Sequence, residues 1–351
     1  MADSNDKHSP GRREFFEKIA GAAAAGAFSG ALLAGGPLAA AQPAGQAGKA
    51  KQPFRGVFTI PSTPFKQDGE IDVPSFRRMI DFCIACGAHG LVFPVNASEW
   101  SVLSDDERFQ LDKVLVEQNA GRLPVIIGVE AASPEWAAKF AAHARAIGAD
   151  GVIAMPPRGE TSPTVLFDYY RKISEAARLP VFVQDHDAPA GTPMPVDLLG
   201  RFCRELEYVK YIKEEAGPTT FKITSVLKAA GGSCKGVFGG AGGRYLIEEH
   251  MRGCCGQMPG CHVTDVVVAL WNALEKGDRA QAMHIYKEMA PLFMFETQLS
   301  GCYKEVLYRR GVIACPLKRN GAMPMDETAS KYLDQILKDL EPLMTVKKRN
   351  S

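Results

Sequence analysis

The chain has 351 residues, of which 46% are hydrophobic, enough to bury a large core. Its 41 basic and 40 acidic residues are interspersed and give a formal net charge of +1, which argues against a nucleic-acid-binding or membrane-surface protein. The length would allow two domains, but single α/β barrels also reach this size.

Residues 1–41 have the organisation of a twin-arginine export signal. Arg12 and Arg13 precede a moderately apolar, Ala/Gly-rich run over residues 19–41, which ends in three alanines typical of a cleavage site. Glycines interrupt this run and it contains little Leu or Ile, which disfavours a membrane-spanning helix. We therefore expect cleavage near Ala41, export to the periplasm and no membrane anchor in the mature protein. A disordered Ala-rich tail and a membrane helix are the alternatives.

Nine cysteines are scattered along the chain. Their odd number and irregular spacing do not indicate a disulfide framework in a chain of this length. Cys83 and Cys86 form a CxxC motif, but neither a second CxxC nor an HxxxH completes a set of zinc ligands. Both lie in an apolar helical pattern with Met79, Ile80 and Phe82, so we expect buried free thiols and no metal site.

After an expected linker over residues 42–53, short apolar runs bounded by Gly or Pro alternate with amphipathic stretches. The runs predict eight strands, at 56–61, 90–95, 124–129, 151–155, 180–184, 209–212, 236–239 and 256–259. The stretches between them include helical patterns at 73–86, 105–119, 134–147, 164–177 and 196–206. Eight strands buried on both faces, in strict alternation with helices, predict an α/β fold, a (β/α)8 TIM barrel over residues 54–262. No GxGxxG follows the first strand, which argues against a dinucleotide-binding fold.

Further helical patterns follow the eighth strand, over residues 265–275, 279–295, 303–310 and 326–340. One helix is enough to close a barrel. Residues 263–345 are therefore expected to form the closing helix and a C-terminal helical extension.

A lysine stands at the end of the sixth predicted strand. Lys213 follows Val209-Lys210-Tyr211-Ile212, and a lysine in an apolar barrel strand is costly unless it is used. Loss of solvation lowers the pKa of a lysine, which makes a neutral amine available to attack a carbonyl carbon. The alternative is a lysine at the barrel rim that pairs with Glu214 or Glu215, and the spacing alone does not decide between the two.

A series of motifs in the same order resembles the dihydrodipicolinate synthase/N-acetylneuraminate lyase family over residues 54–343. The motifs are Thr63-Pro64-Phe65 with Asp68-Gly69-Glu70-Ile71-Asp72, Asn96-Ala97-Ser98-Glu99 with Leu103-Ser104 and Glu107-Arg108, Lys213-Glu214 with Gly217, and Gly253, Gly256 and Met258. They stand where the family has TPF…DGxID, GTTGE…LSxxER, the Schiff-base KExxG of its sixth strand and the glycine loop of its eighth. The resemblance implies a lyase in which Lys213 forms a Schiff base with the C2 carbonyl of a 2-oxo acid. Because the imine itself is the electron sink, no metal or organic cofactor is implied.

The same resemblance implies where the substrate binds. The GTTGE loop of the family holds the substrate carboxylate, which places Asn96, Ala97, Ser98 and Glu99 there. Asn96 and Ala97 replace two threonines, and backbone N–H groups, the Asn96 amide and the Ser98 hydroxyl remain able to hold an anion. Met258, in the glycine loop, is also expected to contact the substrate.

A glycine-rich segment over residues 239–243 follows the seventh predicted strand. Its backbone N–H groups are a candidate anion site at Gly240, and a flexible loop is the alternative.

Departures from the family pattern narrow the expected activity. Gln184 stands where the fifth strand of the family carries a tyrosine that shuttles protons, and glutamine cannot transfer a proton as a phenol does. The family arginine that grips a second carboxylate aligns with Gly191, so dihydrodipicolinate synthesis is not expected. Asn96-Ala97-Ser98-Glu99 and Gln184-Asp185 instead resemble the branch that includes 2-keto-3-deoxy-sugar-acid dehydratases. Gln184 and Asp185 are thus predicted to be catalytic beside Lys213.

The expected reaction is dehydration of a 2-keto-3-deoxy sugar acid. Its leaving hydroxyl needs an acid, and Asp185, His186, Asp187 and Glu214 are candidates by position. Retro-aldol cleavage that releases pyruvate is the second possibility. A periplasmic 2-oxo-acid or sugar-acid binding protein without turnover is the alternative of another class. The implied partner is a small 2-oxo acid, and the family resemblance implies a homo-oligomer, a dimer or a tetramer.

Overall fold

A computed structural model describes residues 53–321 and 323–346. The predicted export signal at residues 1–41 and nearly all of the predicted linker lie outside the described residues. In the part described, no helix is both long and apolar enough to cross a membrane.

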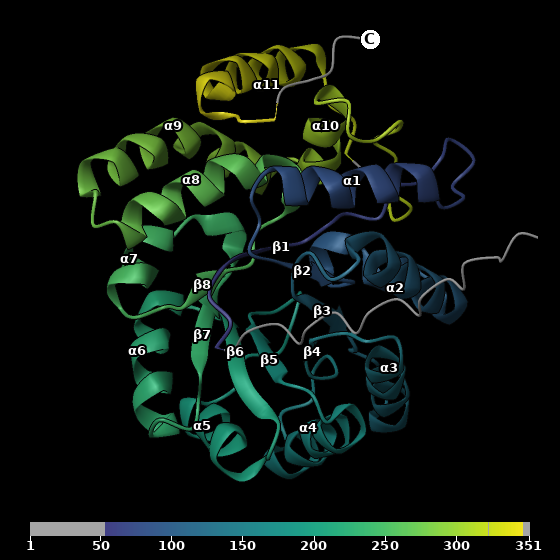
Figure 1. Ribbon diagram of the computed structural model, residues 1–351, viewed down its shortest axis with the longest axis vertical. Coiled ribbons are helices and arrows are strands. Elements are labelled where there is room, and N and C mark those ends of the chain that lie inside the picture. Colours follow the sequence, from purple (N-terminus) through teal and green to yellow (C-terminus); the bar gives the residue numbers. More distant parts are fainter. Residues whose placement is uncertain (1–52, 322, 347–351) are drawn as a thin grey trace, which may run out of the picture. The chain divides into compact units, whose positions relative to one another are not determined.

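Eight parallel strands close into a barrel with helices around it (Figure 1). They are β1 (Gly56–Thr59), β2 (Gly90–Phe93), β3 (Val125–Gly128), β4 (Gly151–Ala154), β5 (Val181–His186), β6 (Val209–Glu215), β7 (Gly236–Gly239) and β8 (Gly256–Gln257). Closure is direct, because β1 pairs with β2 through Phe58 and Gly90 and with β8 through Gly56 and Gly256. The predicted fold class is confirmed.

The barrel helices are α1 (Val73–Ala85), α2 (Asp105–Asn119), α3 (Pro134–Ala146), α4 (Pro163–Ala177), α5 (Val196–Glu205), α6 (Thr219–Ala230), α7 (Leu246–Met251) and α8 (Thr264–Glu275). Local sequence explains their starts. Before α2, for example, Ser104 and Glu107 form a capping box in which each side chain accepts from the other's backbone N–H.

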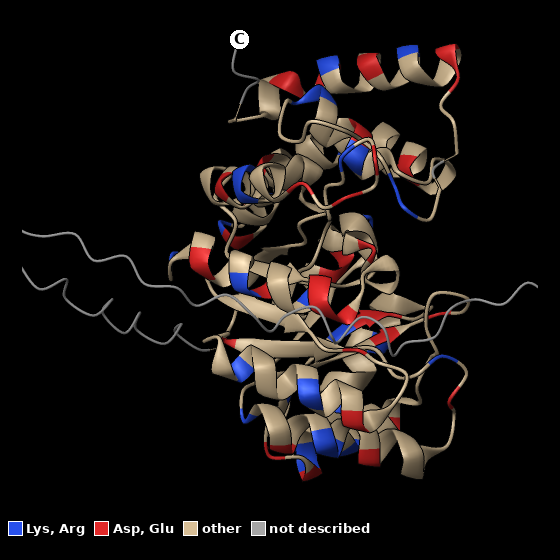
Figure 2. Ribbon diagram, turned by 90° about the vertical axis from the view of Figure 1, so that its right-hand side faces the viewer, with Lys and Arg blue, Asp and Glu red and all other residues tan. Residues whose placement is uncertain are grey.

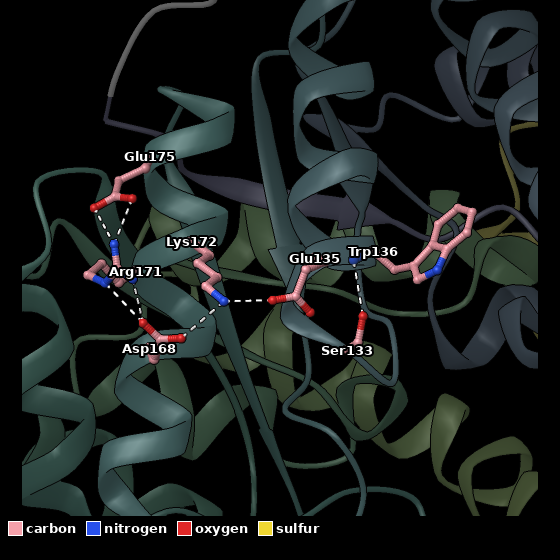
Figure 3. A network of polar contacts seen from close by, with 7 residues as sticks. All are labelled: Ser133, Glu135, Trp136, Asp168, Arg171, Lys172 and Glu175. Carbon is pink, nitrogen blue, oxygen red and sulfur yellow. Dashed lines mark hydrogen bonds and ion pairs between the residues drawn. The ribbon is translucent and has the colours of Figure 1, made fainter.

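Acidic and basic residues are interspersed along the helices (Figure 2). Figure 3 shows one such surface network, in which Glu135 of α3 lies 2.7 Å from Lys172 of α4. Asp168 joins Lys172 to Arg171 in the same network. These side chains are exposed or half-buried, so solvent screens the pairs and the network mainly keeps the outer face polar.

Beyond α8, a helical extension packs beside the barrel. It comprises α9 (Arg279–Gln298), which packs on α8, and α10 (Cys302–Arg309) and α11 (Glu327–Leu340), which pack on α9 toward the top of Figure 1. A continuous apolar cluster joins α8 to the extension, with Trp271, Leu292, Val306 and Leu333 among its buried members. All nine cysteines fall within the described residues, and all are buried free thiols.

Successive side chains of each strand point alternately into two apolar layers, one inside the barrel and one between the strands and the helices. This alternation decides which side chains reach the site. Phe182 of β5 and Tyr211 of β6 belong to a cluster inside the barrel, where their rings stack with centroids 4.5 Å apart. Their neighbours Val183 and Ile212 belong to the layer between strands and helices. Successive side chains of a strand point to opposite faces. Residues that follow Phe182 or Tyr211 by an even number therefore face the barrel interior.

Two strands are longer than predicted. The expected ends at residues 184 and 212 were set by the last apolar or neutral positions, but pairing of β5 with β6 continues through His186 and Glu215. Polar residues thus take part in the sheet at the carboxyl ends of these strands, where active sites of such barrels lie.

Candidate active site

Lys213 lies inside the barrel near the carboxyl end of β6. It is an even step from Tyr211 and is only 3% exposed. Its Nζ lies 3.0 Å from Oε2 of Glu215, the next residue of β6 on the same face. Lys213 is therefore buried in the barrel and is also paired with a carboxylate.

Gln184 is in register with Lys213 on the neighbouring strand, β5. Its Nε2 donates to Oε2 of Glu215 over 2.7 Å, so both side chains converge on one carboxylate oxygen. The other oxygen, Oε1, accepts from the backbone N–H of Ala241 at 3.0 Å. Burial raises the pKa of the Glu215 carboxyl, but Lys213, His186 and the Ala241 N–H together hold it below its usual range.

Gly240 makes room for this carboxylate. A Cβ at that position would lie 2.2 Å from Oε1 of Glu215, which is too close for any side chain. The carbonyl of Gly240 accepts from Nε2 of Gln257 at 2.7 Å. Gly240, which was predicted to bind an anion, therefore allows the loop after β7 to approach Glu215 closely.

Asp185 is separated from the other predicted catalytic residues. It lies an odd step from Phe182, on the face of β5 that meets the helices, and its carboxylate pairs with Lys222 of α6. It also accepts from the backbone N–H of Met194 at 2.8 Å. The prediction placed Asp185 in a loop after the strand, but β5 continues past it, and strand alternation turns the side chain away from Lys213.

Glu214 belongs to the same outward-facing group as Asp185. The two residues are in register, and Oε1 of Glu214 lies 3.8 Å from Nζ of Lys222. Burial and the neighbouring Asp185 raise the pKa of Glu214 to about 9. This pair of carboxylates and its lysine therefore stabilise the contact of β5 and β6 with α6, outside the barrel interior.

The loop after β2 forms a 3-10 turn, Asn96–Ser98. The Asn96 side chain accepts from Nε1 of Trp100 at 3.2 Å and points its amide nitrogen at Sδ of Met155, 3.6 Å away. The Ser98 hydroxyl donates to the carbonyl of Pro61 at 2.7 Å and is fully buried. Asn96 is thus placed on the open side of the loop, whereas Ser98 anchors the loop to the segment after β1.

Glu99, which ends this loop, pairs with Lys304 of α10. Nζ of Lys304 also donates to the carbonyl of Leu317 at 2.7 Å. Burial lowers the pKa of Lys304 to about 8, against the opposing effect of Glu99. The predicted carboxylate-binding residue Glu99 therefore ties the loop to the C-terminal extension.

Met258 follows β8 and is 1% exposed within the cluster inside the barrel. Its backbone N–H donates to the carbonyl of Gly239 at 3.1 Å. It therefore contributes to the apolar lining of the barrel interior.

Two cavities open near Asn96. The first, of about 210 Å³, is lined by Asn96, Ala97 and Glu99 on one side and by residues of α9 and α10, including Tyr303, on the other. The second, of about 270 Å³, lies among Trp100, Glu130, Met155 and Arg158. Asn96 connects them, since its amide group contacts two residues that line the second.

Glu130 was not among the residues predicted from sequence. It follows β3 by an even step from Ile126 of the interior cluster and is only 2% exposed. The available signal was a carboxylate two residues beyond an apolar strand, in Gly128-Val129-Glu130. From the sequence, Glu215 was predicted only as a possible partner of Lys213.

Comparison with known proteins places these features in context. The model of the dihydrodipicolinate synthetase family matches residues 53–340. The chain is 32% identical to L-2-keto-3-deoxyarabonate dehydratase of Azospirillum brasilense, over 83% of this chain and 96% of that protein. It is 27% identical to the probable 2-dehydro-3-deoxy-D-pentonate aldolase YjhH of Escherichia coli strain K12, over 81% of this chain and 95% of that protein.

Solved structures give the same picture. Dihydrodipicolinate synthase of Rhodopseudomonas palustris superimposes with a TM-score of 0.76 at 26% identity, over 82% of this chain and 97% of that one. Another neighbour, with a TM-score of 0.75 and 25% identity over 83% of this chain and 98% of that one, is described as the first monomeric dihydrodipicolinate synthase variant. The expected homo-oligomer stays a prediction.

Proposed function

The chain belongs to the dihydrodipicolinate synthetase family, and from this premise we propose that it dehydrates a 2-keto-3-deoxy sugar acid through a Schiff base on Lys213. The family includes dehydratases, aldolases and synthases, so the general class of activity is that of a lyase. The observation that carries the proposal is the buried amine of Lys213 with a carboxylate oxygen of Glu215 at 3.0 Å.

Imine formation needs a neutral amine and a group that manages protons. Glu215 is in contact with Nζ and accepts a proton from it, after which the amine attacks C2 of the 2-oxo acid. The C2–N bond forms, Glu215 returns the proton to the former carbonyl oxygen, and this oxygen leaves as water, which restores the Glu215 carboxylate. The carboxylate of Glu215 then removes a proton from C3, and the electrons flow into the iminium to give an enamine.

Elimination follows from the enamine. Its electron pair re-forms the iminium, a C3–C4 double bond appears, and the C4–O bond breaks. The departing oxygen takes up a proton and leaves as a second water. Hydrolysis of the imine returns Lys213, and no oxidant, reductant or further reactant is needed.

The absence of a phenol at position 184 supports elimination over aldol chemistry. Gln184 cannot transfer a proton, but its amide holds Glu215 in place at 2.7 Å. Retro-aldol cleavage is the second candidate, favoured by the likeness to the E. coli protein named as an aldolase. It requires removal of a proton from the C4 hydroxyl, whereas dehydration requires addition of one, so the two reactions demand opposite proton transfers.

The test is borohydride reduction of the mature protein with pyruvate and, separately, with 2-keto-3-deoxyarabonate and other 2-keto-3-deoxy sugar acids. Intact mass and peptide mapping should locate the adduct on Lys213, and the unreduced reactions should yield a dehydrated product rather than free pyruvate. Lys213→Ala should form no adduct. Lys210→Ala, on the same strand, is the matched control and should form it normally.

Other outcomes are equally informative. Release of pyruvate without dehydration would replace the dehydratase by an aldolase. Failure of the wild-type protein to form any adduct would remove the imine mechanism and leave a binding protein.

A further inference from the structure

A buried carboxylate lies at the carboxyl end of β3, apart from the contacts of Lys213 with Glu215. Neither carboxylate oxygen of Glu130 has a hydrogen-bond partner among the described residues, and the side chain is 2% exposed. Buried polar groups are almost always hydrogen-bonded, so an exception in a native fold calls for an explanation. A ligand that supplies the missing partner is one.

The backbone geometry directs Glu130 toward the interior. Ile126 belongs to the cluster inside the barrel, whereas Ile127 and Val129 belong to the layer beneath the helices. Glu130, an even step from Ile126, lines the cavity of about 270 Å³ that also contains Trp100 and Met155. Its carboxylate is therefore part of a cavity wall at the end of the barrel where Lys213 lies.

The side chain of Arg108, in α2, forms hydrogen bonds with backbone carbonyls of this segment and none with the Glu130 carboxylate. Its NH1 donates to the carbonyl of Glu130 at 3.0 Å and its NH2 to the carbonyl of Gly128 at 3.1 Å. Burial raises the pKa of Glu130 to about 7, against the opposing charges of Arg108 and Lys213. Asp112, also buried near Arg108, carries a second carboxyl whose pKa is raised by burial.

Glu215 and Glu130 are two buried carboxyl groups in contrasting environments. Glu215 is held in its charged form by Lys213 and backbone N–H contact, whereas Glu130 is held toward its neutral form by burial. A pair of titratable groups whose pKa values are pushed apart is the usual arrangement of a base and an acid in one site.

We propose that Glu130 is the catalytic acid that protonates the hydroxyl leaving from C4 of the substrate. The inference rests on the proposed function and completes its elimination step. As the C4–O bond breaks, the proton moves from the Glu130 carboxyl to the departing oxygen, and water leaves. The resulting Glu130 carboxylate regains a proton from solvent before the next turnover.

The candidate proton donors that the sequence named by position, Asp185, His186, Asp187 and Glu214, make other contacts. Asp185 and Glu214 face the helices and are paired with Lys222. Asp187 accepts from the backbone N–H of Gly217 at 2.7 Å. His186 faces the interior, but its Nδ1 contacts the carbonyl of Asp187 at 2.9 Å and its ring is only partly buried.

The experiment separates loss of a proton donor from loss of the site. The variant is Glu130→Gln, which keeps size and polarity but holds no transferable proton. Its matched control is Asp112→Asn, since Asp112 is equally buried, unpartnered among the described residues and close to Arg108. Three probes are used: pyruvate, 2-keto-3-deoxyarabonate, and an analogue of the latter with fluorine in place of the C4 hydroxyl.

We expect Glu130→Gln to retain borohydride trapping of pyruvate and deuterium exchange at its C3, which report a folded site with a working Lys213. Its kcat for 2-keto-3-deoxyarabonate should fall by roughly 10²- to 10⁴-fold, the usual contribution of a general acid. Elimination of fluoride should fall by less than about tenfold, because fluoride needs little acid assistance to leave. Asp112→Asn should match the wild type throughout.

The inference is overturned if Glu130→Gln dehydrates 2-keto-3-deoxyarabonate within threefold of the wild-type rate, or if its elimination of fluoride falls as severely as its dehydration. The first result would assign the proton to another group, with His186 next in line. The second would make Glu130 a substrate-positioning residue. Failure of the proposed function itself looks different, because the wild-type protein would then form no adduct on Lys213.

Discussion

The amide of Gln184 donates to Oε2 of Glu215 over 2.7 Å, and that same oxygen lies 3.0 Å from the amine of Lys213. A residue that cannot carry protons therefore orients one that can. In the proposed mechanism the carboxylate of Glu215 takes the proton-transfer role that a phenol on β5 has in the family pattern. The Gln184 amide holds that carboxylate in its orientation toward the lysine.

Replacement of Gln184 by Leu should test this arrangement. Leu has a similar volume but cannot donate, and loss of a hydrogen bond to a charged group costs about 1.5–3 kcal/mol. Both the rate of borohydride trapping with pyruvate and kcat should fall by roughly 10- to 100-fold, since 1.4 kcal/mol corresponds to about a factor of ten. An unchanged trapping rate would mean that Glu215 keeps its position without Gln184. Circular dichroism serves as the control for folding.

Gly240→Ala should impair the same carboxylate from the opposite side. The new Cβ would lie 2.2 Å from Oε1 of Glu215, so the β7 loop or the carboxylate must move. A displacement of about 1 Å in a catalytic group can cost roughly 10²-fold in rate. We expect a loss of that order in steady-state dehydration with little change in the far-ultraviolet spectrum. Activity within threefold of wild type would show that Glu215 does not need its present position.

Lys304→Met should destabilise the protein, because it leaves the carboxylate of Glu99 buried without its partner. Removal of one member of a buried pair typically costs about 3–5 kcal/mol. The double variant with Glu99→Gln should recover part of that loss, and urea unfolding of the four proteins gives the coupling between the two sites. Additive losses would contradict a direct energetic link between the loop and α10.

A pH effect is expected at the junction of the segment before β1 with the end of α8. Arg55 forms two hydrogen bonds with Glu275, at 2.6 and 2.7 Å, and these together with His250 lower the pKa of Glu275 to about 2 despite partial burial. Because the folded-state pKa lies below the ordinary value of 4.5, this contact stabilises the fold above pH 4.5. The contribution is lost as the pH falls toward 2.

The Tm of Glu275→Gln should therefore lie below that of the wild type at pH 7. The difference should be small, since exposed ion pairs contribute about 0–1 kcal/mol, and it should shrink steadily between pH 4.5 and pH 2. Scanning calorimetry of both proteins over this range gives the comparison. A difference that grows on acidification would contradict the assignment.

The proposed periplasmic address depends on residues outside the described part of the chain. Replacement of Arg12 and Arg13 by Lys should leave the full-length protein in the cytoplasm with its signal uncleaved, because the pathway recognises the paired arginines. Cell fractionation with immunoblotting provides the measurement. Normal export of the double variant would rule out the twin-arginine route.

The fold was predictable because hydrophobic periodicity repeats along the whole chain. Eight apolar runs alternate strictly with helical patterns, which fits a closed parallel barrel better than an open doubly wound sheet, and the structure has that barrel. Lys213 was predictable for the same reason, since a lysine is conspicuous in such a run. The motif resemblance then supplied its chemistry.

The surroundings of Lys213 were harder to predict because a strand's end decides which way each later side chain points. Gln184 and Asp185 are adjacent in the sequence, yet one faces Glu215 and the other Lys222. A strand ending at residue 184 left the direction of Asp185 open, and pairing through His186 fixes it. Glu130 escaped prediction because its place in a cavity wall depends on residues from other segments, such as Trp100 and Met155, that the fold brings to it.

The nine buried thiols have a consequence for the life of the molecule. While the native structure lasts, the thiols are buried and protected from oxidation. A chain that unfolds in an oxidising compartment exposes these thiols together, and disulfides between them would then compete with refolding. Durability in the periplasm would thus depend on the rate of unfolding, and a damaged molecule would be replaced by new synthesis rather than repaired.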